Sequence, residues 1–163
     1  MSTAEIDQLR AAMRSAQVSG KGQYIGEGRH LLEVDKALVK RSTFEGNTKE
    51  TWIIEFKVIE SSNPTHEVGQ TRSYVENPAN AGWMGRFKGA LLGLIGAETV
   101  TPQAEAAIGD LFVALRHDEE RDRLKLPENF LHGRRVRCEG MAGKSKKGGD
   151  ITNLRWSVAE RQP

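Results

Sequence analysis

The chain has 163 residues, of which 37% are hydrophobic and 28% are charged, and its formal net charge is +2 at pH 7. This length and composition predict a single globular domain and exclude a disordered or fibrous chain. No apolar run approaches the roughly 18 residues that cross a bilayer, and the charged N-terminus lacks the apolar core of a secretory signal. Because the chain has one cysteine, Cys138, no internal disulfide can form, and we expect a cytoplasmic protein without membrane contact.

The net charge conceals an asymmetry along the chain. Residues 134–163 contain eight Lys or Arg residues against three acidic residues, so this end carries +5 and the remainder carries −3. A basic end on a nearly neutral chain predicts a local anionic partner. The alternative is a solvated, lysine-rich surface without a specific partner.

The first predicted element is an N-terminal helix over residues 2–17. Ser2 and Glu5 have the spacing of a capping box. Apolar residues then recur at helical spacing, namely Ile6, Leu9, Met13 and Ala16. The following stretch, VSGKGQ, breaks this pattern and is typical of a linker. We therefore divide the chain into a helical arm (1–20), a main domain (21–159) and a short tail (160–163).

Three predicted strands follow the linker. The first covers residues 29–40, and its apolar phase slips near Lys36, which predicts a β-bulge. The polar stretch RSTFEGNTKE is then expected to form a loop. The second strand, residues 51–60, alternates most clearly, with an apolar face of Trp52, Ile54, Phe56 and Val58. A turn region, SSNPTHEVG, leads into the third strand at residues 70–75.

The C-terminal half begins with two predicted helices, residues 79–96 and 102–117. The first would let a backbone pack closely, at some loss of helix propensity, because it carries glycines four residues apart, Gly85, Gly89 and Gly93. A charged connector, RHDEERDRLKLPENF, precedes two further strands, residues 133–140 and 150–159. The Lys/Gly-rich stretch GKSKKGG joins these last two strands.

Three strands, a helical insert and two more strands follow the element order of an OB-fold, a five-stranded, partly open barrel. The expected fold class is therefore mainly β with helices, with the insert between strands three and four. Other small barrels and sandwiches share mixed element orders of this kind. OB-folds bind oligonucleotides on strands two and three and with the loops one–two and four–five. In this chain those loops would be RSTFEGNTKE and the Lys/Gly-rich stretch.

A protein that binds single-stranded nucleic acid needs cations along the phosphates and flat side chains against the bases. The candidate cations lie on the two loops and on strands three and five: Lys40, Arg41, Lys49, Arg72, Lys144, Lys146, Lys147 and Arg155. The candidate stacking residues are Phe44 in the first loop, Tyr74 on strand three and Trp52 on strand two. Trp52 and Trp156 also fit packing in the core, and Tyr24 is a weaker stacking candidate.

Catalytic interpretations find little support in the residues. The GKS at 143–145 is not a phosphate loop, because that motif would require a glycine where Cys138 stands. The four histidines lack metal-ligand spacing with Cys138 or with one another. The acidic run at 118–120 would suit a metal-dependent nuclease, but its arginine neighbours favour a salt-bridged, solvated face. No nucleophile motif is present, so we expect a non-enzyme with neither a metal nor another cofactor.

Four segments resemble phage and prophage OB-fold single-stranded DNA-binding proteins: GQYIGEGRHLLEVDKALVKRS, EFKVIESSNPTHEVGQTRSYV, WMGRFKGALLGLIG and GRRVRCEGMAGKSKKGGDITNLRW. The likeness covers roughly residues 22–96 and 133–157 and is one of residue type and order. It implies a protein that coats single strands during phage DNA replication or recombination. The end, VAERQP, departs from the acidic tails of many single-strand binders, which puts recruitment of replication enzymes by a tail in doubt.

The residues leave other partners open. RNA would use the same surface as single-stranded DNA, because no residue type declares recognition of the 2′-hydroxyl. A homo-oligomer is also compatible with the sequence. The rival class is a non-enzymatic protein-interaction module, such as a phage adaptor or inhibitor. In that case the glycine-containing helix at 79–96 would be a docking or dimer surface.

Overall fold

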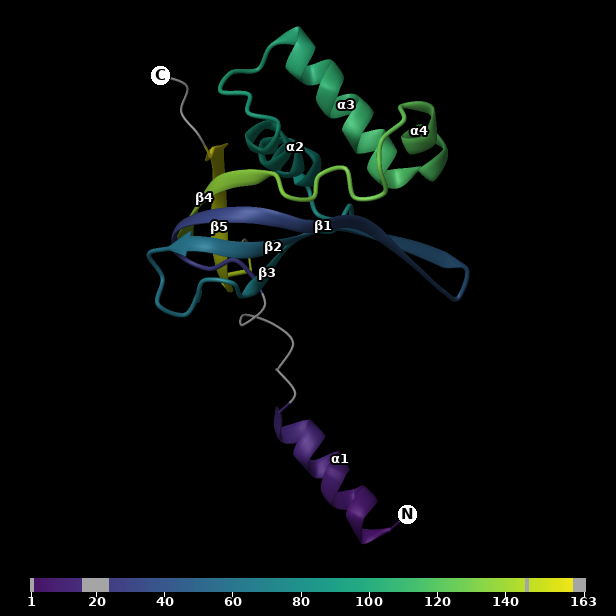
Figure 1. Cartoon of the computed structure of the whole chain (residues 1–163), viewed down its shortest axis with the longest axis vertical. Helices are drawn as coiled ribbons and strands as arrows, with labels where there is room; N and C mark the ends of the chain where they lie inside the picture. Colours follow the sequence, from purple (N-terminus) through teal and green to yellow (C-terminus); the bar gives the residue numbers. More distant parts are fainter. Residues whose placement is uncertain (1, 16–23, 146, 160–163) are drawn as a thin grey trace.

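The computed structural model describes residues 2–15, 24–145 and 147–159. Its elements in chain order are α1 (Thr3–Ser15), β1 (Gly28–Phe44), β2 (Asn47–Ser61), β3 (Thr71–Glu76), α2 (Trp83–Leu94), α3 (Pro102–Arg116), α4 (Asp118–Arg123), β4 (Arg135–Lys144) and β5 (Asp150–Val158). This confirms a mainly β architecture with helices between the third and fourth strands (Figure 1). No helix in the described part of the chain is long and apolar enough to cross a membrane.

All five strands form one antiparallel sheet in the order β3-β2-β1-β4-β5. The register of β1 against β2 shifts between Val34 and Lys36, which confirms the predicted bulge. A second shift, between Leu31 and Leu32, was not predicted. Among the described residues no backbone pairing joins β3 to β5, so hydrogen bonds do not close the sheet.

The predicted loop RSTFEGNTKE is wrong, because β1 and β2 continue through it as a two-stranded ribbon. Only Glu45 and Gly46 form the turn, with φ values of 50° and 79°. Two successive positive φ values are the conformation of a type I′ turn, which matches the twist of antiparallel strands. The ribbon residues are almost all exposed on both faces, so their sequence shows no apolar alternation that would have revealed a strand.

The helices agree with the sequence in type, and α2 and α3 are shorter than predicted. The predicted end of α1 at residue 17 and the predicted linker VSGKGQ lie outside the described residues. The capping box of α1 forms, since the amide of Glu5 donates to Ser2 Oγ and the amide of Ser2 donates to Glu5 Oε2, each at 3.2 Å. Thr101 caps α3, accepting from the amide of Ala104 at 3.1 Å. The charged connector is not wholly irregular, because it contains the short helix α4.

The core lies between the sheet and α2 and α3. The inward face of β2 is buried as predicted, with Trp52, Phe56 and Val58 each at most 1% exposed. The ring of Trp52 stacks on Phe112 of α3, with centroids 4.3 Å apart and an angle of 11° between the planes. Phe87 of α2 meets the same Trp52 ring edge-on at 5.4 Å.

One glycine of α2 lets the helix approach the sheet closely. A Cβ on Gly93 would lie 2.5 Å from Val136 Cγ2 and 3.2 Å from the carbonyl oxygen of Ser157. A Cβ on Gly89 would lie 3.6 Å from Trp156 Cδ1, which is ordinary contact. The predicted close packing at four-residue glycine spacing is therefore present at Gly93.

We expect Gly93→Ala to lower the free energy of unfolding by about 1–3 kcal/mol, because α2 must move away from a buried, β-branched valine. Gly89→Ala is the matched control in the same helix, and it should raise stability by roughly 0.5–1 kcal/mol through helix propensity alone. Urea denaturation of both variants measures the difference. Equal stability of the two variants would contradict the close approach of α2.

Candidate nucleic-acid interface

A cavity of about 1430 Å³ lies where the sheet is not closed, between β3 and the hairpin formed by β4 and β5. Its walls come from parts of the chain that are far apart in sequence. They are the lead-in segment (residues 24–27), Asn63 in the β2–β3 turn, the end of β3, the connection from β3 to α2, and residues 142–143, 145, 150–154 and 156 of the hairpin. We call this cavity the cleft.

The cleft combines aromatic and amide side chains with few free cations. Trp156 is half-buried in its lining, and Tyr24 is 45% exposed at its edge. Amides also line it, from Asn63, Asn80 and Asn153. The charged residues of the lining are Glu27, Glu76, Arg86 and Asp150. Two of the three carboxylates are neutralised by ion pairs, Glu76 by Arg86 and Asp150 by Lys144. The lining therefore offers no cluster of cations to phosphates, whereas its rings and amides suit the faces and edges of bases.

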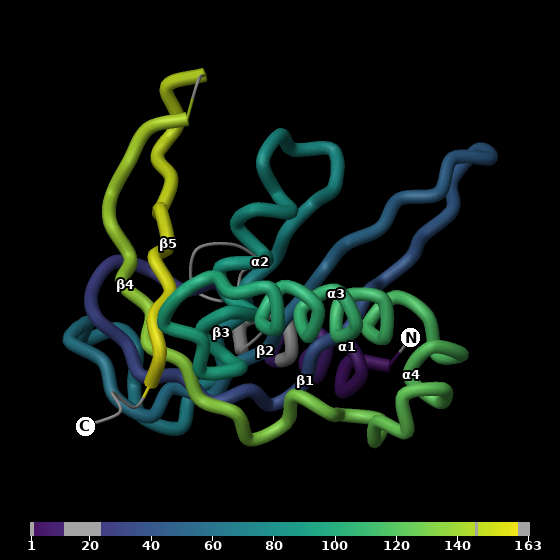
Figure 2. Tube along the Cα trace, turned by 90° about the horizontal axis from the view of Figure 1, so that it is seen from above, coloured from purple at the N-terminus to yellow at the C-terminus, as the bar shows by residue number. Residues whose placement is uncertain are grey.

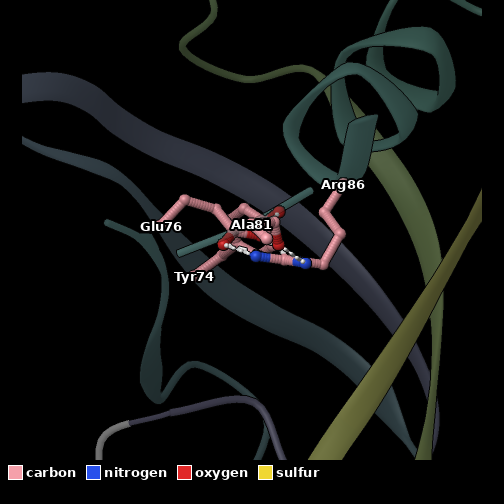
Figure 3. Close-up of polar contacts among 4 residues, drawn as sticks. All are labelled: Tyr74, Glu76, Ala81 and Arg86. Atoms are coloured by element: carbon pink, nitrogen blue, oxygen red, sulfur yellow. Dashed lines mark hydrogen bonds and ion pairs between the residues drawn. The ribbon is translucent and has the colours of Figure 1, made fainter. Parts of the chain in front are cut away.

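A buried carboxylate fixes one wall of the cleft (Figure 3). Glu76 accepts from Tyr74 Oη at 2.5 Å, from Arg86 Nε at 2.9 Å and from Arg86 Nη2 at 3.1 Å. Arg86 Nη1 also donates to the carbonyl of Ala81 at 3.0 Å. Such a bidentate, charge-assisted pair ties the start of α2 to the end of β3. Burial, and then the hydrogen bond to Glu76, raise the pKa of Tyr74, so its hydroxyl stays protonated.

The β1–β2 ribbon presents different residues on its two faces. Alternation along the paired strands places Lys40, Lys49 and Phe44 on one face, and Phe44 is 78% exposed. Arg41 lies on the other face, where its Nη2 donates to the carbonyl of Arg116 at 2.6 Å. Arg116 in turn pairs with Glu50 of β2 at 2.8 Å. Arg41 is therefore tied to the end of α3, whereas Lys40, Lys49 and Phe44 point into solvent.

The β4–β5 hairpin also carries cations on both faces. Lys144 pairs with Asp150 across the hairpin, and Lys147 is exposed at the tip; Lys146 lies outside the described residues. Arg155 lies on the face opposite to Trp156, because neighbouring strand residues point to opposite sides. Figure 2 shows this hairpin and the β1–β2 ribbon projecting to the same side of the molecule. The two form cationic flanks on one side of the protein.

Three of the predicted site residues are buried in this structure and are not available to a ligand. Trp52 is 1% and Tyr74 is 4% exposed, so neither can offer a ring face to a base. Arg72 is also 4% exposed, and its guanidinium donates to the carbonyls of Tyr24 and Thr65 at 3.2 and 2.6 Å. The inward face of β3 is thus polar, with Arg72, Tyr74 and Glu76 in sequence, and its alternation did not identify the buried side.

The structure leaves the remaining predicted residues exposed. They are Lys40, Arg41, Phe44, Lys49, Lys144, Lys147 and Arg155. It also adds residues that the sequence did not single out, since Arg86 and the amides of the cleft carry no local signal. Tyr24, a weaker candidate from sequence, lies in the cleft lining because it pairs with Ser73 in an isolated parallel bridge. No set of three His, Cys, Asp or Glu side chains in the described part is placed to hold a metal ion.

No protein-family model matches this chain, and no curated protein matches it. The resemblance to phage single-stranded DNA-binding proteins therefore stays a prediction. What the interface can bind follows from its geometry and charge.

Two buried histidines hold the lead-in segment in place. The rings of His30 and His66 stack at 4.7 Å with 13° between their planes, and they are 2% and 5% exposed. Burial, then Arg72 and then His30, lower the pKa of His66 from 6.5 to about 4. Burial also lowers the pKa of His30, with Arg72 adding to the shift and the carbonyl of Gly26 opposing it. Both rings are therefore neutral at pH 7.

These histidines predict a stability that falls on acidification. The unfolded chain takes up a proton on His66 near pH 6.5, whereas the folded chain does so only near pH 4. The contribution is complete above pH 6.5 and is lost as the pH falls from 6.5 to about 4, by roughly 3 kcal/mol for His66. Urea denaturation at pH 7, 6, 5 and 4.5 measures this loss. His66→Gln, which cannot titrate, should show a shallower dependence, and an identical slope would contradict the assignment.

Proposed function

We propose that this protein is a sequence-tolerant single-stranded DNA-binding protein built on an OB-type barrel. The observation that carries the proposal is the cleft between β3 and β5, with exposed cations on the two hairpins that project on one side. Rings and amides inside the cleft can contact the bases of a single strand, and cations outside it can contact the phosphates.

The strand order supports the OB-type assignment. In β3-β2-β1-β4-β5, the two edge strands are those that face each other when such a barrel closes. The β1–β2 ribbon and the β4–β5 hairpin take the places of the loops one–two and four–five, which contact oligonucleotides in OB-folds. The gap between β3 and β5 is then the opening of a partly open barrel.

The charges suggest how a strand would lie. Bases would enter the cleft and meet Tyr24 and Trp156, because rings and amides line it and its carboxylates Glu76 and Asp150 already pair with Arg86 and Lys144. Phosphates would run over the flanks, near Lys144 and Lys147 on one hairpin and near Lys40 and Lys49 on the other. Stacking on rings tolerates any base, which fits binding without sequence preference. Single-stranded RNA has the same rings and phosphates and would use the same surface.

Fluorescence anisotropy of a labelled 30-nucleotide oligo-dT, with a duplex of equal length as the control, tests this function. We expect a clear preference for the single strand, because bases in a duplex are stacked and cannot enter the cleft. The logarithm of affinity should fall with the logarithm of salt concentration, with a slope near −0.7 per phosphate neutralised. A salt-independent affinity would contradict the role of the cationic flanks. Absence of binding to either DNA would redirect the search to a protein partner by pull-down.

A further inference from the structure

The lead-in segment, residues 24–27, is a wall of the cleft, and side chains from other parts of the chain bind its backbone. Asn63 Nδ2 donates to the carbonyl of Glu27 at 2.8 Å, and Arg72 Nη1 donates to the carbonyl of Tyr24 at 3.2 Å. Both partners come from the region of the β2–β3 turn, about 40 residues away along the chain. The conformation of the segment is thus imposed by tertiary contacts.

The histidine pair contacts both backbone groups of Gly26 in this segment, the amide and the carbonyl. Its amide donates to His66 Nε2 at 2.9 Å, and its carbonyl oxygen lies 2.9 Å from His30 Nε2. These contacts require neutral His66 with an unprotonated Nε2, and His30 with a protonated Nε2. The other ring nitrogens contact hydroxyls, Ser61 Oγ at 2.7 Å and Thr65 Oγ1 at 3.0 Å.

The segment also has no room to retreat toward the sheet. A Cβ on Gly140 of β4 would lie 2.1 Å from the carbonyl oxygen of Gly26. On the other side, a Cβ on Gly26 would lie 3.1 Å from His66 Cε1. Gly26 is therefore enclosed between β4 and the histidine pair, and its position is defined within narrow limits.

Tyr24, two residues before Gly26, depends on this arrangement. Its backbone pairs with Ser73 at the edge of β3, and its carbonyl accepts from Arg72. The residue is 45% exposed and belongs to the cleft lining. We propose that His30, His66 and Arg72 form a clasp that positions the Tyr24 ring as a stacking surface for a base at the edge of the cleft. The base as the ligand of Tyr24 rests on the proposed function, whereas the clasp itself rests on the contacts described above.

A double-mutant cycle on Tyr24 and His66 tests the inference, with the dissociation constant for oligo-dT at 0.1 M salt as the readout. Tyr24→Ala should weaken binding between about 5- and 150-fold, the range of one base–aromatic stack. His66→Leu removes the acceptor for the Gly26 amide and should weaken binding by a comparable factor. In the Tyr24→Ala background, His66→Leu should have little further effect, because the ring it positions is already absent.

A conservative variant separates positioning from general stability. His66→Gln keeps an acceptor within reach of the Gly26 amide and should bind nearly as tightly as the unmodified protein. Thermal unfolding of each variant checks that it is folded, and His30→Leu, which removes the donor to the Gly26 carbonyl, replaces His66→Leu if the latter does not fold. If the double variant loses affinity by the product of the two single losses, the two residues act independently and the clasp is wrong. Unchanged binding by Tyr24→Ala would also overturn the proposal.

Hydrogen exchange distinguishes failure of the clasp from failure of the proposed function. In His66→Leu the Gly26 amide should exchange at least tenfold faster, whereas the amide of Leu32 in β1 should be unchanged. If the unmodified protein binds no single strand but the Gly26 amide exchanges faster in His66→Leu, the proposed function is wrong. The histidines then hold the lead-in segment, but Tyr24 stacks on no base. If the exchange of Gly26 is unchanged, the clasp is wrong whatever the protein binds.

Discussion

Replacing Lys144, Lys146 and Lys147 together by glutamate is expected to weaken binding of single-stranded DNA about 100-fold at 0.1 M salt. Each lysine that neutralises a phosphate contributes about 0.7 to the salt slope. Loss of three contacts therefore flattens the slope by about 2 and lowers the affinity by about two powers of ten at this salt concentration. Anisotropy titrations with oligo-dT between about 0.05 and 0.3 M salt, a range around physiological ionic strength, measure both the affinity and the salt slope.

The matched control reverses three cations that belong to neither hairpin, Lys88 of α2, Arg123 of α4 and Lys125. It changes the net charge by the same amount, and we expect less than a threefold change in affinity. The hairpin variant should stay folded, because the exposed pair of Lys144 with Asp150 contributes at most about 1 kcal/mol. Equal loss of affinity in both variants would mean that net charge alone attracts DNA. Unchanged binding in the hairpin variant, with a protein partner still captured, would favour the protein-interaction module.

Gly140→Ala is expected to lower the free energy of unfolding by about 3 kcal/mol, because among the described glycines an added Cβ comes closest to another atom here. The added Cβ would lie 2.1 Å from the carbonyl oxygen of Gly26 and 2.9 Å from its carbonyl carbon. Both atoms belong to the backbone of the lead-in segment, which the histidine pair prevents from moving away. Overpacking against such a neighbour costs at the upper end of the usual 1–3 kcal/mol. Urea denaturation at pH 7 gives the value.

Gly143→Ala, three residues further along β4, is the control for this effect. Its Cβ would lie 2.5 Å from Asn153 Nδ2, but that atom ends an exposed side chain that can rotate away. We expect a change within about 0.5 kcal/mol, as for most surface substitutions. A Gly140→Ala protein as stable as Gly143→Ala would show that the lead-in segment does not lie against β4.

The local elements of this protein follow from its sequence, because each depends on residues close together in the chain. Alternation of Trp52, Ile54, Phe56 and Val58 identifies β2 and its buried face. The phase slip near Lys36 indicates the bulge in β1, and the four-residue glycine spacing indicates where α2 meets the sheet. The order of strands and helices indicates the mainly β architecture, since element order depends only on these local patterns.

Where local patterns are weak, the sequence led to errors with physical causes. The β1–β2 ribbon is exposed on both faces, so no apolar period marked it as a strand. In β3 the inward residues Arg72, Tyr74 and Glu76 are polar. They are buried because they find hydrogen-bond partners in the folded chain: Tyr74 in Glu76, Glu76 in Arg86 of α2, and Arg72 in the carbonyls of Tyr24 and Thr65. The sequence around Arg41 indicates a solvent-exposed cation, but its guanidinium donates to the carbonyl of Arg116 at the end of α3.

Tertiary structure alone decided the candidate site. The cleft joins the lead-in segment, β3, the start of α2 and the β4–β5 hairpin, and no local period relates these parts. Two residue pairs hold its walls. Glu76 and Arg86 join β3 to α2, and the stacked His30 and His66 join β1 to the β2–β3 turn. The sequence by itself determined the strands with an apolar face, the longer helices and their order, because propensity and periodicity are local. Which side chains are buried, paired or open to a ligand depends on which segments pack together, and that is a property of the folded chain.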